Sequence, residues 1–223
     1  MDYVFQFGQM WVLREEFLEG TLATLKLSLL SMVLTLIFSV LGAMIRTSGP
    51  KWVRAIIMGY VEIIRNTPLL VQIFFIFFGL PAIGVRLSAD VGALIAFTLN
   101  GTAYTIEIVR AGIESVGQGQ SEAATALGLR RFQVFRLIVL PQALKVIMAP
   151  LGAQFILLML NTSVASAIAA NELTSVALDI QGRTFRAFES FMVVAVIYFI
   201  LSLLFSGLFA AIERLAFGRI KTR

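Results

Sequence analysis

The sequence predicts an all-α membrane protein with five transmembrane helices, and two observations carry this prediction. First, hydrophobic residues make up 59% of the 223 residues and charged residues only 14%, against roughly 45–50% and about 25% in ordinary soluble domains. Second, five long stretches contain no Asp, Glu, Lys or Arg. Lipid offers no hydrogen-bond partners to the peptide backbone, so an uncharged stretch that crosses it is expected to be an α-helix.

The five uncharged stretches are expected to cross the membrane one after another. Each approaches or exceeds the roughly 17–25 residues that a helix needs to span the hydrocarbon. They cover residues 27–45, 69–85, 91–106, 146–170 and 190–212. The third is the shortest, but it can continue through Glu107 to Arg110, an ion pair three residues apart that would lie near the membrane surface.

The chain outside the spans divides into three parts. Residues 1–19 mix aromatic with charged side chains and lack the basic start of a cleaved signal peptide. They are expected either to lie along the membrane surface or to form a tail anchored by Trp11. Residues 20–217 are expected to form the transmembrane domain, which includes the connection 115–141, and residues 218–223 to form a cytoplasmic tail.

The positive charges of the connections predict an outside N-terminus and a cytoplasmic C-terminus, because Lys and Arg collect on the cytoplasmic side. The first connection, the third connection and the tail are rich in them: Arg46, Lys51, Arg54, Arg65, Arg130, Arg131, Arg136, Arg214, Arg219, Lys221 and Arg223. The opposite side carries fewer: Arg14, Arg86, Arg183 and Arg186. The third connection is therefore expected in the cytoplasm.

Residues 115–141, which we call the 115–141 hairpin, form a charged segment punctuated by glycine. Alanines, a leucine and an early glutamate favour a short helix after Ser121, and Gly128 can end that helix in the left-handed conformation. A second short helix is expected to follow and to end at Pro141, whose missing amide interrupts the backbone hydrogen bonding. The two short helices would make a compact projection.

The spacing within this hairpin resembles the EAA loop of bacterial ABC importer permeases. The order Glu-Ala-Ala, three residues, Gly, nine residues, Ile-x-Leu-Pro is met by residues 122–124, 128 and 138–141. In that family the loop is the cytoplasmic coupling element that sits in a cleft of the ATP-hydrolysing subunit. The resemblance implies coupling contacts by Glu122, Ala123, Ala124, Gly128, Arg130 and Arg131. An amphipathic surface helix with a chance match is the alternative.

A second motif precedes the second expected span. Pro68 disfavours helical geometry at Thr67, so the chain is expected to turn there into the membrane; an ordinary kink where a helix begins is the alternative. The run Arg-x-Thr-Pro-Leu-Leu-Val-Gln from Arg65 to Gln72 resembles permeases of the polar amino-acid uptake subfamily. That resemblance, which extends from about Thr21 to the end of the chain, implies a polar or charged amino acid as the substrate.

Polar side chains inside the third and fourth spans are candidates to line a substrate path, because each costs free energy unless it pairs or faces a cavity. The candidates are Asn100, Tyr104 and Glu107 on one face of the third span, and Gln154, Asn161 and Ser163 on the fourth. The alternative is that they join neighbouring helices. Members of the subfamily often carry Lys where this chain has Leu160, so a substrate contact by that Lys is not implied here.

The composition excludes several other functions. The chain has no cysteine for a disulfide or a thiolate metal site and no histidine as a proton shuttle. A Gly-x-x-x-x-Gly-Lys-Ser/Thr segment is missing too, so ATP must be bound by another chain. The net charge of +5 fits loops that face an anionic membrane surface better than it fits nucleic-acid binding.

The predicted function is therefore the membrane-spanning subunit of an ATP-driven ABC importer for polar or charged amino acids in the bacterial inner membrane, not an enzyme. The resemblance implies ATPase subunits that hold ATP and Mg, an identical or paralogous permease subunit, and an extracytoplasmic binding protein that meets residues 171–186; no cofactor is expected in this chain. The alternative is an ion-gradient-driven secondary amino-acid transporter, for which Glu107 is the candidate proton or sodium site.

Overall fold

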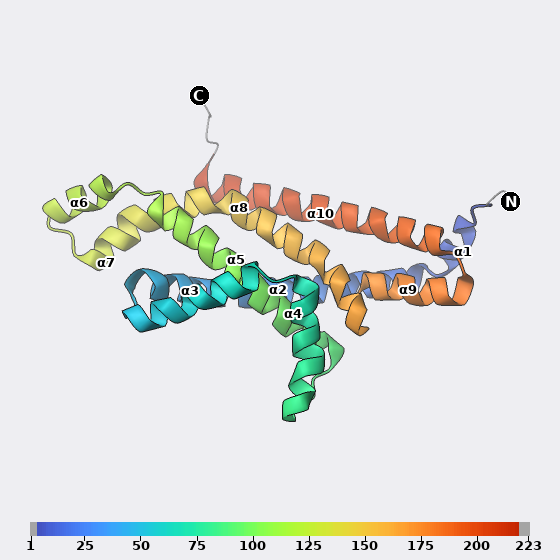
Figure 1. Cartoon of the computed structure of the whole chain (residues 1–223). Helices are drawn as coiled ribbons and strands as arrows, with labels where there is room; N and C mark the ends of the chain where they lie inside the picture. Colours follow the sequence, from blue (N-terminus) through green and yellow to red (C-terminus); the bar gives the residue numbers. More distant parts are fainter. Residues whose placement is uncertain (1–3, 219–223) are drawn as a thin grey trace.

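The computed structural model describes residues 4–218, apart from the side chain of Ser48, and the regular elements within that range are all helices. Four long helices set the long axis of the molecule: α2 (Arg14–Ser48), α5 (Ala89–Glu114), α8 (Leu140–Asn161) and α10 (Ala187–Phe217) (Figure 1). Four segments are long and apolar enough to cross a membrane, or five if one bent pair of helices counts as a span. The prediction of an all-α membrane protein is confirmed.

Helix α2 contains the uncharged stretch 27–45 and extends beyond it at both ends. Glu15 and Glu16 lie in its first turn and Arg46 in its last, so each charge lies at the end of the helix dipole that it stabilises. The helix runs unbroken across residues 19 and 20, where the N-terminal segment was expected to meet the transmembrane domain. Phe17 is buried in the bundle, together with Met10 of α1 (Phe7–Val12).

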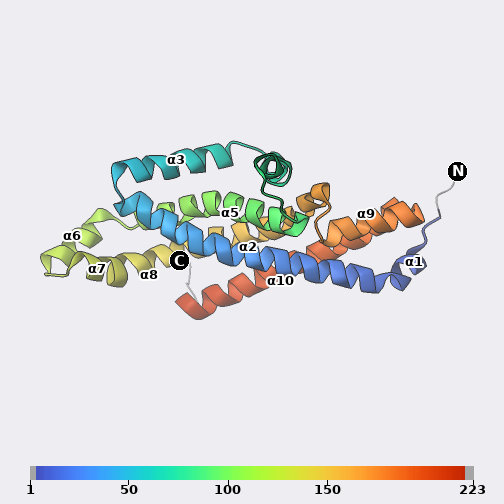
Figure 2. The same cartoon turned by 90° about the horizontal axis from the view of Figure 1, so that it is seen from below.

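The second expected span, residues 69–85, is not a straight helix of its own. The basic stretch before it is mostly α3 (Lys51–Arg65), which packs on α2 and α5. Near Pro68 the chain then bends by 110°. The bent arm consists of α4 (Leu69–Phe74), a π-helical turn η1 (Phe75–Gly79) and a 3-10 turn η2 (Leu80–Ile83). It leaves the bundle sideways, which is why Figure 2 shows it end-on.

The fourth expected span begins earlier than the sequence indicated. Helix α7 (Arg131–Val134) continues through the π-helical turn η3 (Phe135–Val139) into α8, and the 3-10 turn η4 (Thr162–Ile168) extends α8 further. The prediction that Pro141 ends a separate short helix was wrong, because Pro141 lies in the first turn of α8. The wider π-helical turn just before it leaves room for the proline ring, which would clash with a carbonyl of a regular helix.

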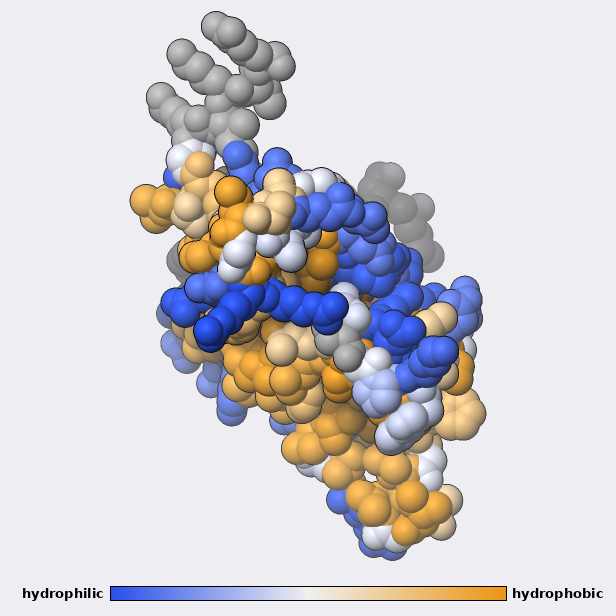
Figure 3. All heavy atoms as spheres, turned by 90° about the vertical axis from the view of Figure 1, so that its left-hand side faces the viewer, coloured by the Kyte–Doolittle hydropathy of each residue, from blue (hydrophilic) through white to orange (hydrophobic). Residues whose placement is uncertain are grey.

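Two apolar clusters hold the bundle together. One joins α1, α2, α8, α9 (Leu173–Thr184) and α10 around Phe155, Met159 and Ile180. The other joins α2, α4, α5 and η4 around Ile73 and Phe97. Seen from the end that carries α6 (Gln118–Ala126) and α7, hydrophilic residues gather over that end, while the sideways arm below is largely hydrophobic (Figure 3).

Small hydroxyl side chains allow α2 to approach its neighbours closely. They recur every three or four residues along one face of α2 and are fully buried: Thr24, Ser28, Ser31, Thr35 and Ser39. Gly101 on α5 meets this face, since an added Cβ there would lie 2.6 Å from the Thr35 hydroxyl oxygen and 2.9 Å from Leu158 of α8. Small residues at such contacts are the usual way for helices to associate in lipid.

Candidate functional site

The 115–141 hairpin projects from one end of the bundle, where α6 and α7 follow α5 and lead into α8 (Figure 1). Gly128 closes the turn between them with a φ of +84°, so the expected left-handed glycine is present. Its N–H donates to the carbonyl of Thr125 at 2.9 Å, and the N–H of Leu129 donates to that of Ala124 at 3.2 Å. These bonds satisfy carbonyls that the end of α6 would otherwise leave unpaired.

The hairpin has a small apolar core of its own. Ala124, Val134 and Val139 are buried, and Ile113 of α5 packs against them. The hairpin is therefore fastened to the end of α5 as well as to α8, to which it is joined covalently. Displacement of the hairpin must displace both helices.

The predicted coupling residues divide by exposure. Glu122, Ala123, Gly128, Arg130 and Arg131 are exposed, whereas Ala124 belongs to the hairpin core. Arg130 also begins α7, where its backbone N–H donates to the side chain of Gln133 at 2.8 Å.

Two apolar residues of the hairpin were missed from the sequence. Leu127 is 82% exposed and Phe132 is 69% exposed, and they lie on either side of Gly128 along the chain. Large apolar side chains that are exposed on a polar projection are candidates for contact with a partner. Their position outside every uncharged stretch was the signal available in the sequence.

Asn100 on α5 connects to the bend between α3 and α4 through Gln72. The Asn100 amide nitrogen donates to the Gln72 side-chain oxygen at 3.0 Å. The Gln72 amide nitrogen in turn lies 2.8 Å from the carbonyl of Ile64 and 3.0 Å from that of Thr67, both freed by the break before Pro68. Gln72, which is 8% exposed, was not singled out from the sequence. Its polar side chain within an otherwise apolar run was the signal.

Tyr104 lies one turn further along the same face of α5. The guanidinium carbon of Arg65, at the end of α3, lies 5.3 Å from the centre of its ring, within the range of a cation–π interaction. This face of α5 therefore meets the α3–α4 bend at two successive levels. Tyr104 remains half-buried.

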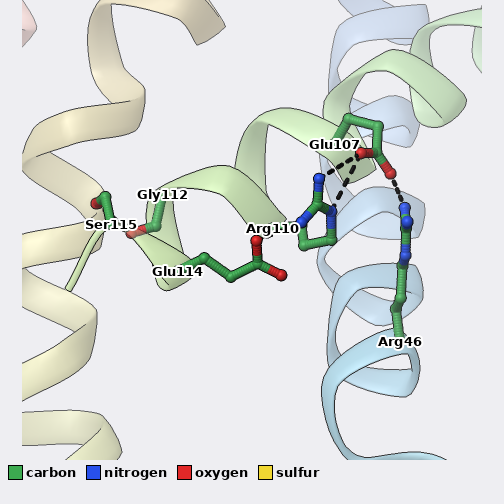
Figure 4. Close-up of polar contacts among 6 residues, drawn as sticks. All are labelled: Arg46, Glu107, Arg110, Gly112, Glu114 and Ser115. Atoms are coloured by element: carbon green, nitrogen blue, oxygen red, sulfur yellow. Dashed lines mark hydrogen bonds and ion pairs between the residues drawn. The ribbon is translucent and has the colours of Figure 1, made fainter. Parts of the chain in front are cut away.

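Glu107 is held between two arginines rather than free in a path (Figure 4). One carboxylate oxygen contacts Arg46 of α2, and the other lies 3.0 and 3.1 Å from two guanidinium nitrogens of Arg110. Arg110 also contacts Glu114. The Glu107 side chain is 17% exposed and that of Arg46 is 19% exposed, so these charges are partly withdrawn from water, where an unpaired charge would be costly. The arrangement ties α2 to α5 near the hairpin.

The three candidates on α8 and η4 lie in different surroundings. Gly101 of α5 lies against Leu158 of α8, and Gly112 lies against Ile147. Eleven positions further along α5 therefore correspond to eleven positions back along α8, so the two helices run antiparallel. Gln154 consequently lies level with Tyr104 and is half-buried. Asn161 is exposed, and the Ser163 hydroxyl donates to the carbonyl of Leu160 at 2.8 Å. Within the described residues no hydrogen bond joins these three to Asn100 or Tyr104.

The connection 171–186, expected to meet a binding protein, is mostly helix α9. Glu172 begins that helix and is fully buried, so its carboxylate serves the fold. Asp179 and Arg183 are exposed and pair with each other at 2.9 Å, and Arg183 also contacts Glu16 of α2. The exposed surface at this end therefore comes from α9 and the start of α2 together.

Residues 36–217 match the family described as the inner membrane component of binding-protein-dependent transport systems. The chain belongs to this family. The permease is 34% identical over 212 residues to the glutamine transport system permease protein of Escherichia coli (strain K12), covering 94% of this chain and 97% of that relative. It is 39% identical over 196 residues to the nopaline transport system permease protein of Agrobacterium fabrum, covering 83% and 81%.

Structural similarity agrees with this assignment. The permease resembles the crystal structure of an amino acid ABC transporter with histidines, with a TM-score of 0.90 and 36% identity over 95% of this chain and 99% of that chain. The permease is therefore a multi-pass protein of the bacterial inner membrane, as the sequence predicted.

Proposed function

We propose that the permease is the membrane-spanning subunit of an ATP-driven importer for polar or charged amino acids, and that the 115–141 hairpin receives force from a separate ATPase subunit. The observation that carries the proposal is the exposed surface of the hairpin. Leu127 and Phe132 offer apolar contact area there, and Arg130 and Arg131 add positive charge beside them. The relatives named for glutamine and nopaline transport support an amino acid as the substrate.

Force on the hairpin reaches the spans by a short route. The hairpin core includes Ile113, so movement of α6 carries the end of α5 with it. The contacts of Glu107 with Arg46 and Arg110 then pass the movement from α5 to α2. The left-handed turn at Gly128 keeps the two arms of the hairpin in a defined relation, which rigid coupling requires.

The proposed orientation places the hairpin in the cytoplasm and α9 outside. ATP and Mg would then lie on the ATPase subunits, an identical or paralogous permease would complete the membrane part, and a binding protein would deliver the substrate to the end formed by α9 and the start of α2. The net positive charge of the hairpin supports this direction.

The face of α5 that meets the α3–α4 bend is the proposed substrate path. Asn100, whose amide nitrogen is bound to Gln72, contributes its side-chain oxygen to the proposed path, and Tyr104 contributes its phenol. Gln154 and Asn161, at neighbouring levels of α8, are assigned to the same path. Glu107 is assigned to holding the helices because two arginines share its carboxylate, and Ser163 because its hydroxyl is bound to a carbonyl three residues before it. The same engagement weakens the ion-gradient alternative, for which Glu107 was the candidate site.

Uptake driven by ATP is the test of this function. The permease with its co-purifying ATPase would be reconstituted in vesicles together with the binding protein, and uptake of labelled glutamine, with arginine and histidine as further probes, would be followed with ATP present or depleted. We expect uptake that stops on ATP depletion and survives an ionophore that collapses the ion gradients. Uptake that follows the ion gradient and ignores ATP would contradict the proposal.

The native chain contains no cysteine, so a single Leu127→Cys variant tests the orientation and the docking surface. A membrane-impermeant maleimide should label it only from the cytoplasmic side, and the bound ATPase should protect it from labelling. A matched Asp179→Cys variant on the exposed part of α9 should be labelled from outside and should be unaffected by the ATPase. Reversed labelling would overturn the orientation.

A further inference from the structure

Two cavities lie in a row along α2 and α5, and the proposed path residues Asn100, Tyr104, Gln154 and Asn161 line neither of them. The first, about 410 Å³, is lined by Lys26 and Leu30 of α2, by Asp90 and Leu94 of α5, and by Asn171. The second, about 390 Å³, is lined by Leu34 and Phe38 of α2, by the same Leu94, and by parts of α3 and α5. The side chain of Leu94 lines both cavities, so they adjoin each other along α2 and α5, and we call the two together the groove.

The groove follows α2, one of the candidate membrane spans, over about the depth of one leaflet. Its lining residues on α2 recur at helical spacing from Lys26 to Phe38, twelve positions that correspond to ~18 Å of helix. Half of a hydrocarbon core of roughly 30 Å is about 15 Å. Leu30, Phe38 and Leu99 are each at least 40% exposed, so the groove opens sideways toward the surroundings of the bundle.

The walls of the groove change from polar to apolar along its length. The first cavity carries the charged groups, whereas the second is lined by aliphatic and aromatic side chains with two threonines. The hydroxyl of Tyr60, which also lines the second cavity, donates to the carbonyl of Leu99 at 2.5 Å and is therefore engaged within the protein. A ligand with one charged end and a long apolar chain fits this change from polar to apolar walls.

Lys26 supplies the charge at the polar end. It is the last charged residue of α2 before the uncharged stretch 27–45, which places it at the boundary of the hydrocarbon. Lys26 is exposed, and its ammonium group forms no ion pair within residues 4–218. Asp90 lines the same cavity. One of its carboxylate oxygens accepts the backbone N–H of Asn171 at 2.7 Å, and the other accepts the side-chain amide N–H of Asn171 at 2.9 Å.

We propose that this groove binds one phospholipid, with an acyl chain against Leu94 and the phosphate at the Lys26 ammonium. The Lys26 ammonium is complementary to the phosphate, the Asp90 carboxylate beside it is complementary to the amine of a zwitterionic headgroup, and the depth and apolar walls select an acyl chain. The lipid would cover the seam between α2 and α5 on the leaflet opposite the hairpin. This inference does not depend on the transported substrate or on the ATPase.

The test counts phospholipids retained by the full-length permease in a mild detergent by native mass spectrometry, with phosphatidylglycerol, phosphatidylethanolamine and diacylglycerol as probes. Leu94→Trp fills the shared wall of the groove and should abolish retention of the tightest phospholipid. Lys26→Ala should weaken phosphatidylglycerol binding about five-fold, the effect of one Lys near a lipid headgroup, and should leave diacylglycerol binding unchanged.

Matched controls separate the groove from the rest of the lipid-facing surface. Leu157→Trp adds the same ring on the exposed face of α8, and Lys145→Ala removes an exposed lysine elsewhere on that helix. Both controls should retain the phospholipid. If Leu94→Trp fails to fold, the comparison of Lys26→Ala with Lys145→Ala decides. Equal retention in the groove variants and the controls would overturn the proposal.

A second copy of this chain is the other occupant that the test must distinguish. A single Leu30→Cys variant, in a chain that otherwise has no cysteine, places a thiol on the exposed wall of the groove. We expect it to react with a maleimide-bearing phospholipid and not to form a disulfide-linked dimer in native membranes. Efficient dimer formation through this position would show that protein covers the groove and would refute the lipid site.

Discussion

The end of the bundle that carries α9 and the end that carries the 115–141 hairpin are held together by different interactions. At the α9 end, the fully buried carboxylate of Glu172 accepts N–H groups of its own helix and an O–H group from α10. At the hairpin end, a partly buried ion pair, between Arg46 and Glu107, joins α2 to α5, and the hairpin itself is mostly exposed. We therefore expect the hairpin end to move more easily than the α9 end.

Glu172 shows how the α9 end is locked. Its carboxylate accepts the backbone N–H groups of Thr174 at 2.7 Å and Ser175 at 2.5 Å, and the hydroxyl of Tyr198 on α10 at 2.9 Å. The next residue, Leu173, donates its N–H to Thr24 of α2 at 3.0 Å. Three helices therefore meet at one short segment, in surroundings where a lost hydrogen bond cannot be replaced by water.

The hairpin end has fewer such constraints. The side chains of Glu107 and Arg46 are 17% and 19% exposed, so their charges are less completely withdrawn from water than the carboxylate of Glu172 is. Regions with few buried contacts open most easily. We therefore expect the spans to tilt about the α9 end when the hairpin is displaced.

Replacing Glu172 should have the largest effect on stability. Glu172→Ala removes the cap of α9 and leaves the Tyr198 hydroxyl and backbone N–H groups without an acceptor, which should cost about 3 kcal/mol. Thermal unfolding in detergent measures this loss. Glu15→Ala, at a side chain that is 84% exposed, is the control and should cost less than about 1 kcal/mol, the contribution of an exposed charge in the first turn of a helix. Equal melting temperatures for the two variants would refute the claim that the hydrogen bonds of Glu172 stabilise the α9 end.

Removing the charge of Glu107 should weaken coupling more than folding. Glu107→Gln leaves Arg46 and Arg110 without a shared counter-charge, a loss of about 1–2 kcal/mol for a partly buried pair. The measurement is the ratio of ATP hydrolysed to substrate imported, which should rise. Glu114→Gln removes the charge of an exposed side chain that contacts Arg110, and it should keep the native ratio of ATP hydrolysed to substrate imported. An unchanged ratio in Glu107→Gln would show that the ion pairs do not transmit force.

Distorting the hairpin turn should cost less in stability but still uncouple transport. Gly128→Val meets no neighbouring atom, so its cost is the strain of a positive φ, about 1–2 kcal/mol. We expect ATPase binding or coupled uptake to be lost, as read from co-purification and uptake. Gly119→Val, at a glycine of α6 that also has open space and no positive φ, is the matched control. Normal uptake and assembly in Gly128→Val would count against a rigid hairpin.

The pH dependence of the α9 end should be the smallest of these effects. Burial raises the pKa of Glu172, while hydrogen bonds from Thr174, Ser175 and Tyr198 act in the opposite direction. A raised pKa in the folded state means that this contribution to stability is complete below the unfolded value of about 4.3 and is lost as the pH rises through the folded-state pKa. Relative to Glu172→Gln, the native protein should therefore be more stable at pH 5 than at pH 8. Parallel melting curves for the two proteins would contradict this.

Much of the fold could be predicted because it depends on local sequence. An uncharged run must be helical in lipid whatever lies beside it, and this accounts for the long helices that contain residues 27–45 and 190–212. The turn at Gly128 likewise follows from the conformational freedom of glycine and from bonds to its own helix. The sequence by itself determined these elements and the family motif that they carry.

Only the tertiary structure decided how residues distant in the chain meet. The 110° bend needs the Gln72 amide to satisfy the broken helix end, and Gln72 is positioned by Asn100, 28 residues away. The sequence assigned Glu172 to a connection that meets a binding protein, whereas Tyr198 and the helices around Glu172 bury its side chain. Hydropathy and periodicity describe the surroundings of a helix face on average, whereas the partner of each polar group depends on long-range packing.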